Sequence, residues 1–95
     1  MTILVELGNV VATSNALQTI EEVKGDGARM FTLGLLDRHV HGDWGDICEE
    51  DRGLNEAAIL NGDRLMSVYK DGELTVWIIT EADRSVTTVL LPEDY

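Results

Sequence analysis

The residues best suited to recognition chemistry lie in one short stretch, residues 43–51, which we call the acidic segment. Five of its nine residues are carboxylates and none is basic. Carboxylates at this density favour contact with a cationic partner, and a tryptophan among them can serve as an aromatic anchor. The sequence therefore predicts a partner-binding surface formed by Asp43, Trp44, Asp46, Glu49, Glu50 and Asp51. The alternative for Trp44 is a core position that locks the turn.

The charge of the whole chain agrees with a basic partner. Asp and Glu number 18 against 7 Lys and Arg, which gives a formal net charge of -11. Affinity for phosphate depends on neutralising cations, so direct binding to nucleic acid or to an anionic membrane is not expected. The expected partner is a basic protein that itself binds nucleic acid. The alternative explanation is that the charge serves solubility alone.

The two histidines of the chain raise the question of a metal site. His39, His41 and Asp43 resemble the opening of the His-x-His-x-Asp-His motif of metallo-β-lactamase-like hydrolases. Trp44 stands where that motif has its next histidine, and the chain has only 2 histidines. Because no glycine-rich loop precedes a helix together with a lysine, a nucleotide site is not expected either. The sequence thus predicts no metal, no cofactor and no catalytic residues.

One catalytic alternative remains open, a small acid-base ribonuclease of the barnase and RelE-like class. Its base, phosphate clamp and polar lining would come from His39, Arg84, Ser85, Thr87 and Thr88. General acid-base catalysis by such groups needs them within hydrogen-bonding reach of one another. An acidic chain lacks the cationic cradle that RNA requires. Alternatively, Arg84 pairs with a carboxylate in its own turn and Thr87 is an ordinary strand residue.

The apolar pattern indicates one α+β domain over residues 1–95. Helices are expected at 15–23, 32–41 and 47–61, packed on a C-terminal three-stranded antiparallel meander of residues 65–69, 74–80 and 85–91. A short N-terminal hairpin at Gly8-Asn9 is an open option. Asp46 and Glu49 have the spacing of a helix capping box. The expected core comprises Leu36, Val40, Leu54, Val76, Ile78 and Val89.

Two stretches carry a family resemblance. Residues 38–46, Arg-His-Val-His-Gly-Asp-Trp-Gly-Asp, and residues 77–95 resemble a family of small uncharacterised proteins of plasmids, phages and other bacterial mobile elements. Members are sometimes labelled plasmid-related or type I restriction components. Residence on mobile elements implies acidic inhibitors of nucleic-acid-binding host defence complexes, namely anti-restriction or anti-CRISPR proteins. The resemblance covers the chain from about residue 32 onward.

These observations together predict a non-enzymatic, acidic protein-binding module. The ribonuclease and a structural accessory protein are the alternatives. No apolar run reaches the roughly 18 residues needed to span a bilayer, and the single Cys48 excludes an internal disulfide. We therefore expect a cytoplasmic protein without a membrane partner. Its oligomeric state does not follow from the sequence.

Overall fold

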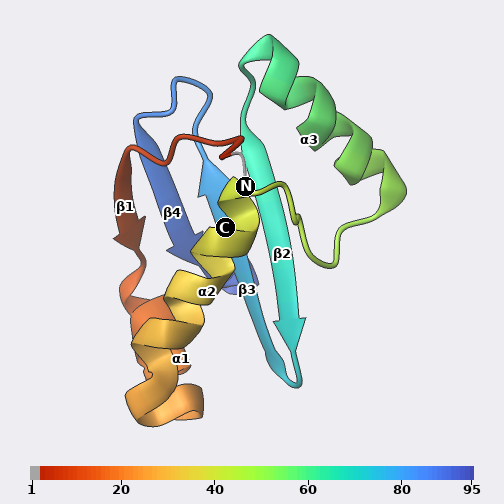
Figure 1. Cartoon of the computed structure of the whole chain (residues 1–95). Coiled ribbons are helices and arrows are strands. Elements are labelled where there is room, and N and C mark those ends of the chain that lie inside the picture. The colour runs from red at the N-terminus through yellow and green to blue at the C-terminus, as the bar shows by residue number, and fades with distance from the viewer. Residues whose placement is uncertain (1–2) are drawn as a thin grey trace.

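The computed structural model describes residues 3–95 and shows an α+β fold built on one sheet (Figure 1). The helices are α1 (Ser14–Lys24), α2 (Ala28–Val40) and α3 (Glu49–Asn61), with single 3-10 turns η1 (Gly25–Gly27) and η2 (Pro92–Asp94). The strands are β1 (Asn9–Ala12), β2 (Leu65–Asp71), β3 (Leu74–Thr80) and β4 (Val86–Leu90). The α+β class predicted from the sequence is confirmed.

The sheet has four strands in the order β1-β4-β3-β2. Strands β2, β3 and β4 form the expected antiparallel meander, whereas β1 runs parallel to β4, with Asn9 opposite Val86 and Ala12 opposite Val89. The expected three-stranded sheet and the N-terminal hairpin option are therefore corrected. Gly8 explains the difference, because its φ is +63° and a Cβ there would lie 2.3 Å from the Ser85 carbonyl oxygen. This close approach directs the chain alongside β4 instead of back on itself.

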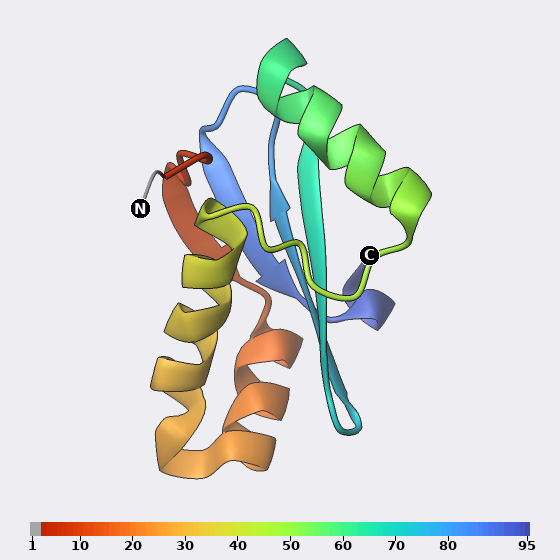
Figure 2. The ribbon, with the colours of Figure 1, turned by 45° about the vertical axis from the view of Figure 1, so that its right-hand side comes forward.

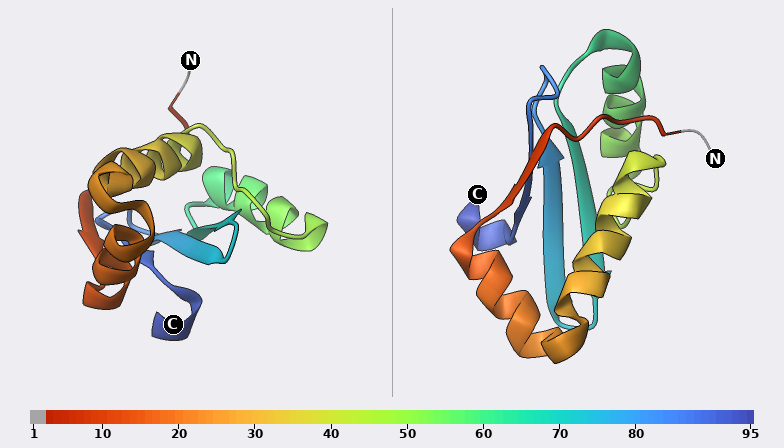
Figure 3. Two further views of the ribbon diagram at one scale, coloured as in Figure 1. Left: turned by 90° about the horizontal axis from the view of Figure 1, so that it is seen from below. Right: turned by 60° about the vertical axis from the view of Figure 1, so that its left-hand side comes forward.

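The helices pack on one face of the sheet. Leu65, Ser67 and Tyr69 of β2 are buried, while the intervening residues are half-buried, as expected when only one face is fully covered. Figures 2 and 3 show α2 and α3 on this face, and the left view of Figure 3 shows η2 on the other. The opposite face is covered in part by Tyr95, whose ring lies edge-on to Trp77 at 5.4 Å.

Two apolar clusters fill the space between helices and sheet. The larger one lies between the helices α1 and α2 and the strands β2, β3 and β4. It contains Ala16, Ile20, Leu35, Leu36, Tyr69, Leu74, Val76, Ile78, Val89 and Leu91. The smaller one joins α3 and the N-terminal segment to β2 and contains Val5, Trp44, Ala58 and Leu65. Within residues 3–95, no helix has the length and apolar character needed to cross a membrane.

Most of the expected core positions are buried, with two exceptions. Val40 is only half-buried, and Leu54 is 63% exposed. The helix α3 begins at Glu49, two residues later than expected, and it directs Asn55 and Ala58 toward the sheet. The apolar stripe read from the sequence was therefore rotated by one residue at Leu54, because a polar residue with a specific backbone partner occupies the inward position.

Candidate functional site

The first part of the acidic segment lies along the outer edge of β2. The Trp44 carbonyl accepts a hydrogen bond from Val68 N at 3.1 Å, and Asp46 N donates to the Val68 carbonyl at 2.6 Å. Between them, Gly45 pairs with Val68 as an isolated parallel bridge. Gly45 has a φ of +77°, and a Cβ there would lie 2.0 Å from the Val68 oxygen. Glycine is therefore required for this contact.

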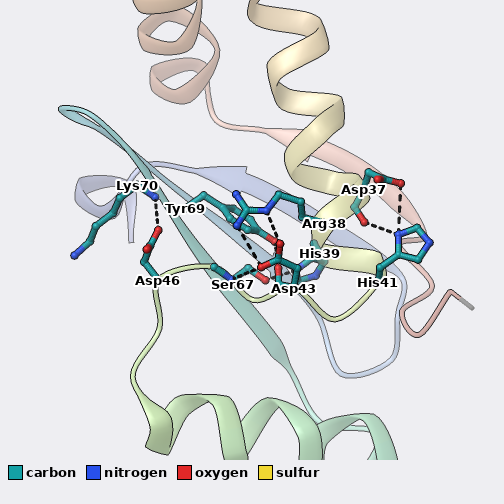
Figure 4. Close-up of polar contacts among 10 residues, drawn as sticks. Asp37, Arg38, His39, His41, Asp43, Asp46, Ser67, Tyr69 and Lys70 are labelled. Atoms are coloured by element: carbon teal, nitrogen blue, oxygen red, sulfur yellow. Dashed lines mark hydrogen bonds and ion pairs between the residues drawn. The ribbon is translucent and has the colours of Figure 1, made fainter. Parts of the chain in front are cut away.

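Two side chains complete the pairing of the same edge, which we call the closed edge. The Asp46 Oδ2 atom accepts a hydrogen bond from Lys70 N at 2.8 Å (Figure 4). Asn55 Nδ2 donates to the Met66 carbonyl at 2.7 Å, and its Oδ1 accepts from Met66 N at 3.2 Å. The capping-box prediction for Asp46 and Glu49 is wrong, since the residue before α3 is Cys48 and makes no side-chain cap. Asp46 is engaged by the strand instead.

Asp43 is held in a compact cluster of its own. Arg38 Nε and Nη2 donate to its two carboxylate oxygens at 2.7 and 3.2 Å, and Gly45 N donates to Oδ1 at 3.2 Å (Figure 4). These hydrogen bonds, that of Arg38 first, lower the pKa of Asp43. Tyr69 donates its hydroxyl to the Asp43 carbonyl at 2.7 Å, and burial raises the pKa of Tyr69 to about 12. The guanidinium of Arg38 stacks 4.6 Å from the Tyr69 ring. Asp43 is thus a turn-forming residue.

Trp44 is a core residue, so its predicted role as a surface anchor is wrong in this structure. Only 1% of it is exposed, and it packs in the cluster with Val5, Ala58 and Leu65. Its ring meets that of His39 edge-on at 5.7 Å. Trp44 follows directly on Asp43. The Asp43 carboxylate holds the turn from the solvent side, and the buried Trp44 ring holds it from the core side.

The remaining three predicted residues lie together on the first turn of α3. Glu49 and Glu50 are exposed and Asp51 is half-buried. The Glu49 side chain is 94% exposed, and its only ion pair among the described residues is a long one of 3.7 Å with Arg52. Carboxylates here face the positive end of the helix dipole, which contributes modestly to stability. Asp43 and Asp46 are also exposed, but Glu49, Glu50 and Asp51 are the three predicted carboxylates without a side-chain hydrogen bond within residues 3–95.

The ribonuclease candidates divide between a buried network and a turn. His39 is completely buried; its Nδ1 lies 2.6 Å from Ser67 Oγ and its Nε2 lies 2.9 Å from Thr80 Oγ1. Thr80 Oγ1 is in turn 2.8 Å from Thr87 Oγ1, and Thr87 donates to the Leu7 carbonyl at 2.8 Å. This chain of hydroxyl groups, which we call the His39 network, crosses the sheet beneath the helices.

The last bond of the His39 network fixes the direction of the others. Thr87 uses its single proton on the Leu7 carbonyl, so Thr80 must donate to Thr87 and accept from His39 Nε2. The histidine is then the Nε2–H tautomer, with Nδ1 accepting from Ser67. Burial, and secondarily the charge of Arg84, lowers the pKa of His39 to about 4. His39 is therefore neutral at physiological pH.

Arg84 and Ser85 lie in the β3–β4 turn, where Arg84 is half-buried and Ser85 is exposed. Arg84 takes a left-handed conformation with φ 62°, and its Nη1 donates to the Asp63 carbonyl at 2.7 Å. Its Nη2 donates to the Ala58 carbonyl at 3.3 Å, which joins the turn to the end of α3. Ser85 donates through N and Oγ to Asp83, whose pKa these bonds lower. The structure does not assemble His39, Arg84 and Ser85 into one open site.

The histidines also diverge from each other. His41 Nδ1 lies 2.8 Å from the Asp37 carbonyl at the end of α2, whereas His39 points into the core (Figure 4). Across residues 3–95, no three His, Cys, Asp or Glu side chains are grouped in a way that would hold a metal ion. Cys48 is exposed and free.

Comparison with known proteins gives no family for this chain. No protein-family model matches it, and no curated protein or solved structure shows significant similarity. The expected relationship to mobile-element proteins therefore stays a prediction. Sequence reasoning missed Asn55 and the His39 network. The signal for Asn55 was its position beside Leu54 on the inward side of an otherwise apolar stripe.

Proposed function

We propose that this protein is an acidic binding module that recognises a basic protein partner through the first turn of α3 and has no catalytic role of its own. The observation that carries the proposal is the availability of Glu49 and Glu50, which are exposed and lie at a helix start beside Asp51. Clustered carboxylates steer association with a cationic surface over a distance set by the ionic strength. The net charge of -11 adds to that field.

A finer part of the proposal concerns the biological setting. A partner with a cationic channel for nucleic acid would meet carboxylates where phosphates normally bind. This suits an inhibitor of a host defence complex encoded by a mobile genetic element, of the anti-CRISPR or anti-restriction kind. A cytoplasmic location is part of the same proposal, since such complexes act there and the exposed thiol of Cys48 fits a reducing compartment.

The test is charge reversal at the start of α3. The double variant Glu49→Lys with Glu50→Lys should lose capture of the basic partner from native host lysate, whereas the wild-type complex should dissociate as salt is raised. Capture is measured by affinity purification and mass spectrometry across a salt series. The variant gives up favourable helix-dipole contacts of about 0.3–1 kcal/mol each, so it should melt only a few degrees lower.

The matched control makes the same change of charge at two positions outside α3. Glu6 and Glu73 are exposed and lie outside α3, so Glu6→Lys with Glu73→Lys changes the net charge equally. This control should keep the partner. If both double variants bind alike, or if capture does not depend on salt, the first turn of α3 is not the recognition surface.

A further inference from the structure

The edge of the sheet opposite the closed edge is formed by β1 and has outward backbone groups without partners. Asn9 N donates to the Ser85 carbonyl and Thr13 N to the Val89 carbonyl, so these residues face β4. A parallel ladder repeats every two residues, which directs the N–H and C=O groups of Val10 and Ala12 away from the sheet. No hydrogen bond to these groups is formed within residues 3–95. Figure 1 shows β1 at the outer limit of the sheet.

An apolar groove of about 640 Å³ lies beside this edge, on the face that the helices cover. It is lined by Val10 and Ala12 of β1, Leu17 and Ile20 of α1, and Leu33 and Leu36 of α2. Val10 is 46% exposed and Leu33 47%, although both face an apolar wall. Large apolar side chains left open in a groove are typical of interaction sites.

The unpaired edge and the groove fit one kind of ligand. Val10 is paired with Thr87 and Ala12 with Val89, and since these two β4 residues are buried in the helix-covered face, Val10 and Ala12 point to that face as well. A strand added beside β1 would place alternate side chains on the same face, where the groove lies. Such a strand would pair with the free backbone groups of β1 and also bury its apolar side chains in the groove.

We propose that β1 and this groove bind an extended segment of a partner protein, which adds to the sheet as a fifth strand. The segment has alternating apolar residues that enter the groove and basic residues beside them. Glu21, Asp26 and Arg29 also line the groove, so the acidic side chains there outnumber the basic one, and the chain as a whole has a formal net charge of -11. A second copy of the same chain would bring an equal negative charge to this edge, which disfavours it as the occupant. The site is separate from the first turn of α3.

A defined peptide tests the proposal. The probe is a fluorescein-labelled peptide of sequence Lys-Lys-Val-Thr-Leu-Thr-Val-Lys-Lys, which has the proposed alternation and charge. We expect saturable binding to the intact protein by fluorescence anisotropy, with slower amide exchange at Val10 and Ala12. Val10→Pro removes an outward N–H and should weaken binding by about tenfold, because proline is tolerated on an edge but cannot pair there.

Leu33→Gln provides a second variant that leaves the strand intact, and it should also weaken binding by about tenfold. Its control is Leu60→Gln, at a residue of α3 that is 86% exposed and lies outside the groove; this variant should bind as wild type does. Equal binding by Val10→Pro, no binding at about 1 mM protein, or a wild-type dimer in sedimentation that Val10→Pro dissociates would overturn the proposal. Equal binding of the peptide with Glu in place of Lys would overturn its basic character.

Discussion

At the β2 edge, the backbone of Met66 and Val68 and the N–H of Lys70 all have partners, supplied by Asn55, the chain at Trp44–Asp46 and the Asp46 carboxylate. At the β1 edge, the corresponding groups of Val10 and Ala12 face outward without partners in the described chain. An exposed edge is a template for strand addition, and proteins usually protect it with charge, side chains or a covering segment.

This contrast between the two edges shows that part of the acidic segment has a structural role. Half of the residues that looked like a recognition surface close an edge of the sheet: Asp43 shapes the turn, Trp44 anchors it in the core and Asp46 binds the strand. The segment prevents pairing at β2, while pairing remains open at β1. Charge density alone did not show which carboxylates bind the chain itself, because the Asp43 and Asp46 side chains accept hydrogen bonds from the backbone at Gly45 and Lys70.

The strongest test of the comparison is to break the closed edge at Gly45. Gly45→Ala should lower the free energy of unfolding by about 3 kcal/mol or more, because it combines a left-handed backbone with a clash against the Val68 carbonyl. Urea denaturation measures the loss, and the Val68 amide should exchange faster.

A control for this change is available in α2. Gly34→Ala introduces the same methyl group where a Cβ meets nothing within 4 Å, in a helix interior. It should stabilise the protein by roughly 0.5–1 kcal/mol. If Gly45→Ala were as harmless as Gly34→Ala, the bridge to β2 would not protect that edge.

The His39 network connects Ser67 of β2 to Leu7, which lies just ahead of β1. Protonation of His39 should therefore disturb the core between the two edges of the sheet. The unfolded chain takes up a proton near pH 6.5, whereas folded His39 does so only at about 4. Stability is therefore full above pH 6.5 and is lost as the pH falls toward 4. Between pH 7 and pH 5 the free energy of unfolding should fall by about 2 kcal/mol.

The measurement is urea denaturation at pH 7, 6 and 5, where Asp43, Asp83 and Asp94 do not interfere, because their pKa values lie below the ordinary 3.8. His39→Gln should be less stable at pH 7 but should lose the slope above pH 5. His41→Gln should keep it. A wild-type stability that is flat from pH 7 to 5 would contradict the buried, neutral histidine.

The smallest effect should come from Asn55, which closes one end of the β2 edge. Asn55→Ala leaves Met66 N and O without side-chain partners, at a cost of about 1 kcal/mol because water can reach a strand edge. Thermal unfolding measures the loss of stability, and faster hydrogen exchange of the Met66 amide shows that the loss arises at the β2 edge. Glu56→Ala, at the neighbouring exposed position, should leave both unchanged; an effect as large as that of Asn55→Ala would assign the loss to α3 itself.

The sequence by itself determined the α+β class, the β2–β3–β4 meander and four core positions, since strand alternation and the Asp71-Gly72 turn are local signals. It also located the helices approximately, because caps and apolar spacing act over a few residues. Val40 and Leu54 were the two exceptions in the core. At Leu54, apolar spacing alone left the helix orientation uncertain by one residue, and the hydrogen bonds of Asn55 to the Met66 backbone decided it.

Only the tertiary structure decided what the polar residues do. The pairing of β1 with β4 joins the two ends of the chain, and the His39 network gathers its groups from β2, β3, β4 and the N-terminal segment. Neither has a short-range signature. The same holds for Asp43 and Asp46, which on the sequence are equivalent to Glu49 and Glu50. Which carboxylates bind their own backbone and which face solvent depends on the strand that lies beside them, and that is set by long-range packing.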